Sequence, residues 1–389
     1  MPITPARRAP VSVALLAAPP PGAQGAQGAV RREAYPLDAV AALERQGFAA
    51  ALAEQGPTPG FAAPLVREVL GRAERRCPEL PGLGLALANR RLLCDSDVTL
   101  AISEDAGAFA ALARGLRLGA LAPRRLALMV CRMAEWAGHA ERRTLLGYRR
   151  VLAGADLVVC FSANQEQVFQ RTLGVDPARL LCVPLGVDQH LFAPRPELQS
   201  PPQERYVLAV GEDPYSDHQL LLEAVRNTRI PVRIHAPRPA SGDLPPNVTW
   251  VSDPLDGEAY RRAIAGAALV AVPTRPAQHP AGSTLLLAAM ASGIPVVATR
   301  SQAMRDYVSH GVNGLLVPPG DAVALARAVQ RLLADPQLSD SLAREGRLSV
   351  ERRFNQEAMW SQIAARLRQL AAQPPRARER ERRRTRASA

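Results

Sequence analysis

The chain lacks lysine entirely, so all 48 of its basic residues are arginines, and against 36 acidic residues they give a formal net charge of +12. Aromatic residues make up only 4% of the sequence, so a core must be built mainly from Ala, Leu and Val. No apolar run approaches the ~20 residues that a membrane-spanning helix needs. The five cysteines are odd in number and none of their spacings is C-x-x-C. This pattern argues against a disulfide framework or a zinc site, and it favours a reducing, cytoplasmic compartment.

What the sequence does have is the composition of a globular protein with room for two cores. Hydrophobic residues account for 47% of the chain and charged residues for 22%, which is not the composition of a disordered protein. A chain of 389 residues exceeds the size at which a single core stops growing. Four prolines fall within residues 194–204, a segment with the composition of a linker.

Apolar strand candidates alternate with helical patterns on both sides of this linker. Before it they are 11–16, 98–102, 126–131, 157–161 and 180–183, and after it they are 206–210, 231–235, 248–251, 268–272, 295–298 and 313–317. Strands separated by helices indicate βα units and parallel sheets. We therefore predict an α/β protein with Rossmann-like domains over 1–193 and 205–372, joined by the linker 194–204 and followed by an Arg-rich disordered tail over 373–389.

Part of the positive charge is concentrated in that tail, where residues 376–386 hold seven arginines against two glutamates. A solvated, disordered end is the favoured interpretation. A weak electrostatic tether to anionic lipid, which would place the protein peripherally at the inner face of a membrane, is the alternative. Nucleic acid is not predicted as a partner, because no aromatic residues interleave with the arginines.

The N-terminus combines Arg7 and Arg8 with the apolar stretch 11–18, a pattern that can mimic a secretory signal. The apolar stretch is short and ends in three prolines, so a first strand followed by a Gly-rich loop explains it better. That loop contains Gly22, which we place on the acceptor side of the protein. Its glycines do not match G-x-G-x-x-G, so it is only a weak indication of phosphate binding.

The most specific stretch of the sequence lies around residues 269–321, where a strand is followed by a loop and by a predicted helix over 283–291, which Gly293 ends. Gly282 lets the backbone come close to a ligand there. The free amides of Ser283, Thr284 and Leu285 then lie at the positive end of the helix dipole, which suits a diphosphate. An ordinary helix capped by the side chain of Ser283 or Thr284 accounts for the same pattern equally well.

The motifs AMASGIPVVAT and GVNGLLVPPGD, followed by a predicted helix over 322–333, resemble the donor-binding core of glycosyltransferase family 4. ADLVVCFSANQ, LGVDPARLLCVPLGVDQHLF and YVLAVG extend the resemblance to roughly residues 95–370. It implies the GT-B fold, with two Rossmann-like domains facing each other across a cleft. It also implies a retaining transferase with a UDP-, GDP- or ADP-linked sugar donor and no tightly bound cofactor. In this fold the last helix, here 356–370, crosses back, which predicts that Trp360 is buried between the domains.

The chain departs from the family at both of the family's donor-binding patterns. The two glutamates that usually contact the donor sugar and the ribose are replaced by Pro280 and Ala288. In the loop after the first strand of the second domain, which begins at Gly211, Glu212 and Asp217 stand where the family has a basic pair. Acidic side chains beside a diphosphate are electrostatically unfavourable. The predicted donor-binding set is Gly211, Glu212, Asp217, Gly282, Ser283, Thr284, Leu285 and Ala288.

Two basic residues are candidates to compensate for the missing contacts. His279 lies in the loop before the helix at Ser283, and Arg132 follows the strand 126–131, near the point where the family often has a sugar-contacting histidine. We assign both as candidate catalytic residues. A solvent-exposed loop histidine and a surface salt bridge are the respective alternatives. Ser162, after the strand 157–161, is a candidate acceptor contact or simply part of a helix cap.

Three functions remain open on the sequence. The favoured one is transfer of a sugar, with retention, from a nucleotide-diphosphate donor to a hydroxyl of a glycan, lipid or small molecule, with the leaving diphosphate helping to deprotonate the acceptor. A divalent ion bridging Glu212 and Asp217 to the diphosphate is a conjecture within this hypothesis. The second function is a catalytically impaired GT-B protein that acts as partner or scaffold for another glycosyltransferase. The third is a different GT-B enzyme, such as a sugar-nucleotide epimerase.

Overall fold

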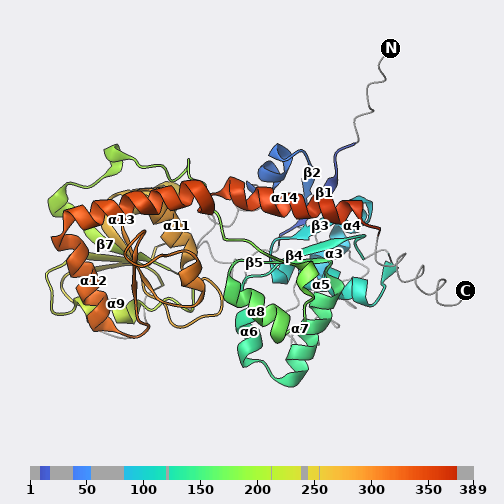
Figure 1. Cartoon of the computed structure of the whole chain (residues 1–389), viewed down its shortest axis with the longest axis horizontal. Coiled ribbons are helices and arrows are strands. Elements are labelled where there is room, and N and C mark those ends of the chain that lie inside the picture. The colour runs from blue at the N-terminus through green and yellow to red at the C-terminus, as the bar shows by residue number, and fades with distance from the viewer. Residues whose placement is uncertain are drawn as a thin grey trace, which may run out of the picture.

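The computed structural model describes residues 9–17, 38–53, 83–119, 122–211, 213–237, 244–253 and 255–374. Within these residues the chain forms two six-stranded sheets, and every strand pairing in both of them is parallel (Figure 1). Helices cover both faces of each sheet, so most strands are buried on both sides. This burial explains why the strands are continuous runs of Ala, Leu and Val rather than alternating patterns.

The N-terminal sheet has the strand order β2-β1-β3-β4-β5-β6. Its strands are β1 (Ser12–Leu16), β2 (Ala49–Leu52), β3 (Val98–Ala101), β4 (Leu126–Met129), β5 (Leu157–Cys160) and β6 (Leu180–Cys182). The helices are 38–45, α3 (Leu83–Ala88), α4 (Arg90–Asp95), α5 (Glu104–Gly115), α6 (Met133–His139), α7 (Arg142–Gly154) and α8 (Ala163–Arg171). The first of these helices ends just before Gly47, which adopts a left-handed φ of 79°.

The C-terminal sheet has the strand order β12-β11-β10-β7-β8-β9. Its strands are β7 (Tyr206–Val210), β8 (Val232–His235), β9 (Val248–Val251), β10 (Ala267–Val272), β11 (Val296–Thr299) and β12 (Leu315–Val317). The helices are α9 (His218–Val225), α10 (Gly257–Ala265), α11 (Ser283–Ala291), α12 (Ala322–Ala334) and α13 (Pro336–Ser349). The strand order reverses between β7 and β10, and in open α/β sheets ligands bind outside the carboxyl ends of the strands at such a point.

The last helix, α14 (Gln356–Ala372), runs from the C-terminal half of the molecule across to the N-terminal sheet (Figure 1). Trp360 is 1% exposed and packs in one cluster with Val13 and Leu15 of β1, as the sequence predicted. Where the chain enters α14 it lies against Gly186, whose missing side chain would overlap the carbonyl of Asn355. The chain therefore passes between the two halves at two places that lie side by side, one near Gly186 and one near Asn355.

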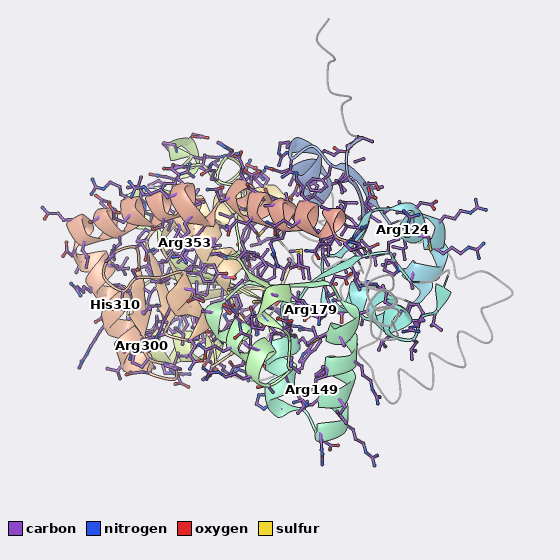
Figure 2. All side chains as sticks on the ribbon, turned by 45° about the vertical axis from the view of Figure 1, so that its right-hand side comes forward. Arg124, Arg149, Arg179, Arg300, His310 and Arg353 are labelled. Atoms are coloured by element: carbon purple, nitrogen blue, oxygen red, sulfur yellow. The ribbon has the colours of Figure 1, made fainter. Side chains whose placement is uncertain are left out.

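Arginine side chains satisfy backbone carbonyls at the carboxyl ends of several helices, which gives part of the positive charge a structural role. Arg149 donates to the carbonyl of Thr172 at the end of α8, from Nε at 3.2 Å and from Nη2 at 2.8 Å. Arg179 donates to the carbonyl of Leu152 near the end of α7 at 2.5 Å. Figure 2 labels both side chains. Arg347 donates in the same way to the last residue of α11, at 2.6 Å.

Most predicted elements begin or end within two or three residues of the observed ones, and the shifts have local causes. Helix α5 starts at Glu104, because the hydroxyl of Ser103 accepts a hydrogen bond from the Ala106 amide and caps the helix. Strand β12 starts at Leu315 rather than at 313, because the buried side chain of Asn313 is hydrogen-bonded to the loop around it. None of the described helices combines the length and the apolar character that crossing a bilayer requires.

Candidate functional site

Helix α11 begins near the carboxyl end of β10, at a position whose backbone conformation and close packing require glycine. Gly282 is the N-cap and adopts the left-handed conformation, with φ at +77°. A Cβ atom at this position would overlap the Cγ1 methyl of Val272. The helix has no side-chain cap, so the predicted alternative of a Ser283 or Thr284 cap is wrong. The Ser283 amide instead bonds the Pro280 carbonyl at 3.1 Å.

The loop after β7 is fixed by hydrogen bonds on both of its sides. A side chain at Gly211 would overlap the Ser216 hydroxyl, so the loop folds tightly over this residue. Asp217 caps α9 by accepting from the Leu220 amide at 3.2 Å, and its own amide donates to the Pro273 carbonyl at 2.9 Å. The carboxylate of Asp217 thus has a structural partner. Glu212 lies outside the described residues.

The same loop is joined to the loop that precedes α11. Ser216 and Thr274 form an antiparallel bridge, and the Arg275 amide donates to the Tyr215 carbonyl at 2.8 Å. The guanidinium of Arg275 also donates to the carbonyl of Pro214. Both loops at the switch point of the sheet therefore form one layer beside the first turn of α11.

His279 lies buried at the centre of this layer, so its predicted alternative as a solvent-exposed loop residue is wrong. It is 2% exposed, and its Nε2 lies 3.3 Å from Oδ2 of Asp213. Its Nδ1 lies 3.5 Å from Oε2 of Glu135, a buried carboxylate on α6 of the N-terminal half. The ring of Tyr215 packs edge-on against the imidazole, with centroids 5.0 Å apart. One imidazole therefore connects carboxylates from the two halves of the molecule.

Asp213 is held ionised by its surroundings. Burial opposes its ionisation, but the hydrogen bond with His279, the hydrogen bond from the Tyr215 amide and the positive charge of Arg132 together lower its pKa. Arg132 comes from the opposite half, where it precedes α6 and lies over the ring of Trp136 at 5.2 Å. The structure thus pairs His279 with Asp213 and places Arg132 near enough for its charge to lower the pKa of the same carboxylate.

A buried glutamate fixes the helix that carries the N-terminal part of this site. Glu104 is 5% exposed, and its carboxylate accepts hydrogen bonds from three successive amides at the start of α6. The donors are Cys131 at 3.1 Å, Arg132 at 2.6 Å and Met133 at 3.0 Å. The positive end of α6 is therefore occupied by the protein's own carboxylate. The first turn of α11 has no such side-chain partner.

Residues 204–335 match the family model described as glycosyl transferases group 1. We call this segment, which is similar to group 1 glycosyltransferases, the group 1 domain. The lipopolysaccharide core biosynthesis glycosyltransferase LpsE of Rhizobium meliloti is 36% identical over 96 residues, covering 25% of this chain and 27% of LpsE. A D-inositol 3-phosphate glycosyltransferase of Geodermatophilus obscurus is 31% identical over 250 residues, covering 54% of this chain and 53% of that protein. The chain therefore spans about half or less of the length of these curated relatives.

Solved structures extend the likeness over both halves of the chain. Sucrose-phosphate synthase from Thermosynechococcus elongatus superposes with a TM-score of 0.70 at 21% identity, covering 93% of this chain and 99% of the synthase. Anabaena HepE in complex with UDP-glucose gives a TM-score of 0.67 at 18% identity, covering 92% and 99% of the two chains. The fold is GT-B, as the sequence predicted.

Within the group 1 domain the predicted donor-binding residues fall into two classes. Gly211, Asp217, Gly282 and the exposed Thr284 lie at the carboxyl edge of the sheet, where a ligand can approach, whereas Ser283 is 4% exposed and its amide is already bonded to Pro280. Leu285 and Ala288 are 3% and 1% exposed, and their side chains belong to the hydrophobic core around α11. Their side chains are thus engaged in packing, which leaves the backbone amide of Leu285 for a ligand.

Across from the group 1 domain, Ser162 is 1% exposed and its hydroxyl donates to the side-chain oxygen of Gln165 at 3.2 Å. This contact supports a structural role at the start of α8. Its neighbour Asn164 instead reaches the other half, where it donates to the carbonyl of Gln278 at 2.6 Å. The other predicted acceptor-side residue, Gly22, lies outside the described residues.

Several residues at this boundary were not singled out from the sequence, among them Glu104, Glu135, Asp213 and Tyr307. The Tyr307 hydroxyl donates to the Phe161 carbonyl at 2.7 Å and accepts from the Leu185 amide at 2.9 Å. Glu104 stands two residues after a strand candidate, and Glu135 four residues after the next one. The amides that bind Glu104 are 27 to 29 positions away, and His279 is 144 positions from Glu135, which no local pattern reports.

The Asp213–His279 pair predicts that the variant Asp213→Asn loses stability by an amount that depends on pH. Because the folded-state pKa of Asp213 is lowered, its contribution to stability is present above the unfolded value near 3.9 and is lost as pH falls through the folded value. We expect Asp213→Asn to reduce the free energy of unfolding by about 1 kcal/mol at pH 7. Urea unfolding should show that this difference shrinks as pH falls below the unfolded value and disappears once pH is below the lowered folded-state pKa of Asp213. In a His279→Ala background the same change should cost less, and an equal cost in both backgrounds would contradict the pairing.

Proposed function

We propose that this protein is a glycosyltransferase that moves a sugar from a nucleotide-diphosphate donor to a hydroxyl group with retention. The observation that carries the proposal is the first turn of α11, which begins without a side-chain cap at Gly282, beside the switch point of the group 1 domain. Backbone amides at a helix start, together with the helix dipole, favour a diphosphate. A structural neighbour that binds UDP-glucose supports a nucleotide-sugar donor.

Two acidic residues of the loop after β7, Asp213 and Asp217, are compatible with this proposal because of their partners. Asp217 is engaged as the cap of α9, and Asp213 is paired with His279 and lies within the field of Arg132. Their negative charge is therefore directed toward positive groups or helix amides of the protein. The diphosphate would lie against the amides of α11, with Arg275 in the adjoining loop as a cationic group near it.

In the proposed reaction the protein supplies position and charge stabilisation rather than a nucleophile. Arg132 and His279, from opposite halves, are the side chains we assign to the leaving group and the donor sugar. A leaving-group oxygen of the diphosphate takes the proton of the acceptor hydroxyl, so the new glycosidic bond forms on the face from which the nucleotide departs. The linker 194–204 and the crossing at Asn355 are the points about which the halves would move apart to admit substrate.

The acceptor in this proposal is a glycan, a lipid or a small molecule. A glycan or lipid-linked glycan is favoured, because LpsE is named for lipopolysaccharide core biosynthesis. A second function remains supported by one observation, which is that the family's two glutamate positions are held here by Pro280 and by the core residue Ala288. Without side-chain acceptors for sugar and ribose hydroxyls, the protein could act as a catalytically impaired partner of another glycosyltransferase.

The test is calorimetric titration of the full chain with UDP, GDP and ADP, each with and without magnesium. We expect saturable binding of one of these nucleotides, and the matching nucleotide sugars then define the donor in a transfer assay. Retention is checked by the anomeric configuration of the product in nuclear magnetic resonance spectra. Absence of binding by protein that unfolds cooperatively would overturn the transferase proposal and favour the partner function. A dependence on magnesium would revive the hypothesis of a bridging ion.

A further inference from the structure

Two cysteines lie side by side in the N-terminal sheet without being joined. Cys160 ends β5 and Cys182 ends β6, and the two residues are direct partners in the parallel register. Both are free thiols, and both side chains face the hydrophobic cluster between the sheet and helices α5, α7 and α8. Neighbouring strands lie about 4.8 Å apart, which falls within the range of about 4.4–6.8 Å that a disulfide requires between Cα atoms.

The two thiols are chemically unequal. Cys160 is fully buried, whereas Cys182 is half-buried and can be reached by a small solute. A hydrogen bond between the two thiols lowers the pKa of Cys182, against the effects of burial and of nearby carboxylates. The same contact, together with burial, raises the pKa of Cys160. Because a thiolate is the nucleophile in thiol chemistry, Cys182 is suited to react first and Cys160 to react second.

We propose that Cys160 and Cys182 form a redox-sensitive pair that closes reversibly to a disulfide when the protein meets a peroxide. The Cys182 thiolate attacks one oxygen of hydrogen peroxide, which gives a sulfenic acid and hydroxide. The Cys160 sulfur then attacks the sulfenic sulfur, forms the S–S bond and releases the second oxygen as water. Two thiols are oxidised and one peroxide is reduced to two water molecules. A dithiol reductant reverses the step by thiol–disulfide exchange.

The position of the pair connects it to the boundary between the two halves. Phe161 follows Cys160 directly, and its carbonyl accepts the Tyr307 hydroxyl at 2.7 Å. The same hydroxyl accepts from the amide of Leu185, three residues after Cys182, at 2.9 Å. A disulfide would therefore fix the two strand ends that hold Tyr307. The oxidised pair would change the strength with which this tyrosine joins the halves.

The experiment treats the full-length protein with a small excess of hydrogen peroxide, blocks the remaining thiols and maps the tryptic peptides by mass spectrometry. Cleavage at arginine places Cys160 in peptide 151–171 and Cys182 in peptide 180–205, because the bond after Arg195 precedes a proline. We expect both unlinked peptides to be lost together and one linked peptide to replace them. Treatment with dithiothreitol should restore both.

Two variants keep the test decisive if one of them folds poorly. Cys160→Ala removes the second thiol, so dimedone should trap a sulfenic acid on Cys182. Cys182→Ser removes the first, so peptide 151–171 should stay unmodified. Cys94→Ser alters another half-buried cysteine and should leave the linkage unchanged. The proposal is overturned if peroxide leaves both peptides unlinked, or if Cys182 is no faster to react than Cys94. Neither result bears on nucleotide binding, so this test is independent of the proposed function.

Discussion

Substitution of Gly282 by alanine is expected to weaken nucleotide binding by about tenfold or more, a change of at least ~1.4 kcal/mol. Two effects combine at this position. The left-handed φ of +77° is unfavourable for a residue with a side chain, by about 1–2 kcal/mol. The added methyl would also overlap the Cγ1 methyl of Val272, so the first turn of α11 must shift. Titration calorimetry with the nucleotide that the native protein binds measures the loss.

Gly311 provides a matched control for this prediction. Its φ is also +77°, but a Cβ atom there would meet no other atom within 4 Å. Gly311→Ala should therefore destabilise the fold by a similar ~1–2 kcal/mol and leave nucleotide affinity unchanged. Adding Val272→Ala to Gly282→Ala removes the overlap but not the strain, and should recover part of the affinity. Equal affinities for the Gly282 and Gly311 variants would show that the start of α11 does not hold the diphosphate.

Removal of the Glu104 carboxylate is expected to produce the largest loss of stability among the acidic residues of the site. In Glu104→Ala the amides of Cys131, Arg132 and Met133 lose their acceptor, and the positive end of α6 loses its counter-charge. Each buried donor that is left without an acceptor costs about 1–3 kcal/mol. Water that enters the site relieves part of this cost, so we expect a total loss of stability of about 3 kcal/mol. Chemical denaturation at pH 7 measures this change.

Two further variants distinguish the cap from general effects of removing an acid. Glu104→Gln keeps one acceptor oxygen but not the charge, and should lose about half as much stability as Glu104→Ala. Glu141 stands at the N-cap of α7, is exposed and makes no cap hydrogen bond, so Glu141→Ala should change stability by less than about 0.5 kcal/mol. If the Glu104→Ala and Glu141→Ala variants were equally stable, the cap would have no energetic role.

The group 1 domain was more predictable from sequence than the N-terminal half. Strands β7 and β9 and helix α11 were predicted with their observed bounds, because buried parallel strands are short apolar runs and Gly282 and Gly293 mark the ends of α11. Helix α7 was not identified. Its apolar residues are fewer and its face is rich in arginine, so its burial against α5 depends on packing rather than on composition.

At the candidate site, too, features set by residues close in the sequence were predictable, and features set by distant residues were not. The close approach of the backbone at Gly282 was predictable, because a left-handed backbone before a helix favours glycine over every residue with a side chain. The burial of His279 was not, because it depends on Glu135 approaching from α6, 144 positions earlier in the sequence. A partner this far away in the sequence cannot be inferred from the residues around the histidine.

The sequence by itself determined the two parallel α/β halves, the proline-rich composition of 194–204, the GT-B resemblance and the presence of Pro280 and Ala288 where that resemblance expects glutamates. Each of these follows from apolar periodicity, from turn residues or from the identity of a side chain at one position. Only the tertiary structure decided that Glu104 caps α6, that His279 lies between two carboxylates and that Cys160 faces Cys182. The physical reason is that hydrogen bonds and ion pairs form between atoms that the strand order of the sheets and the meeting of their edges bring together.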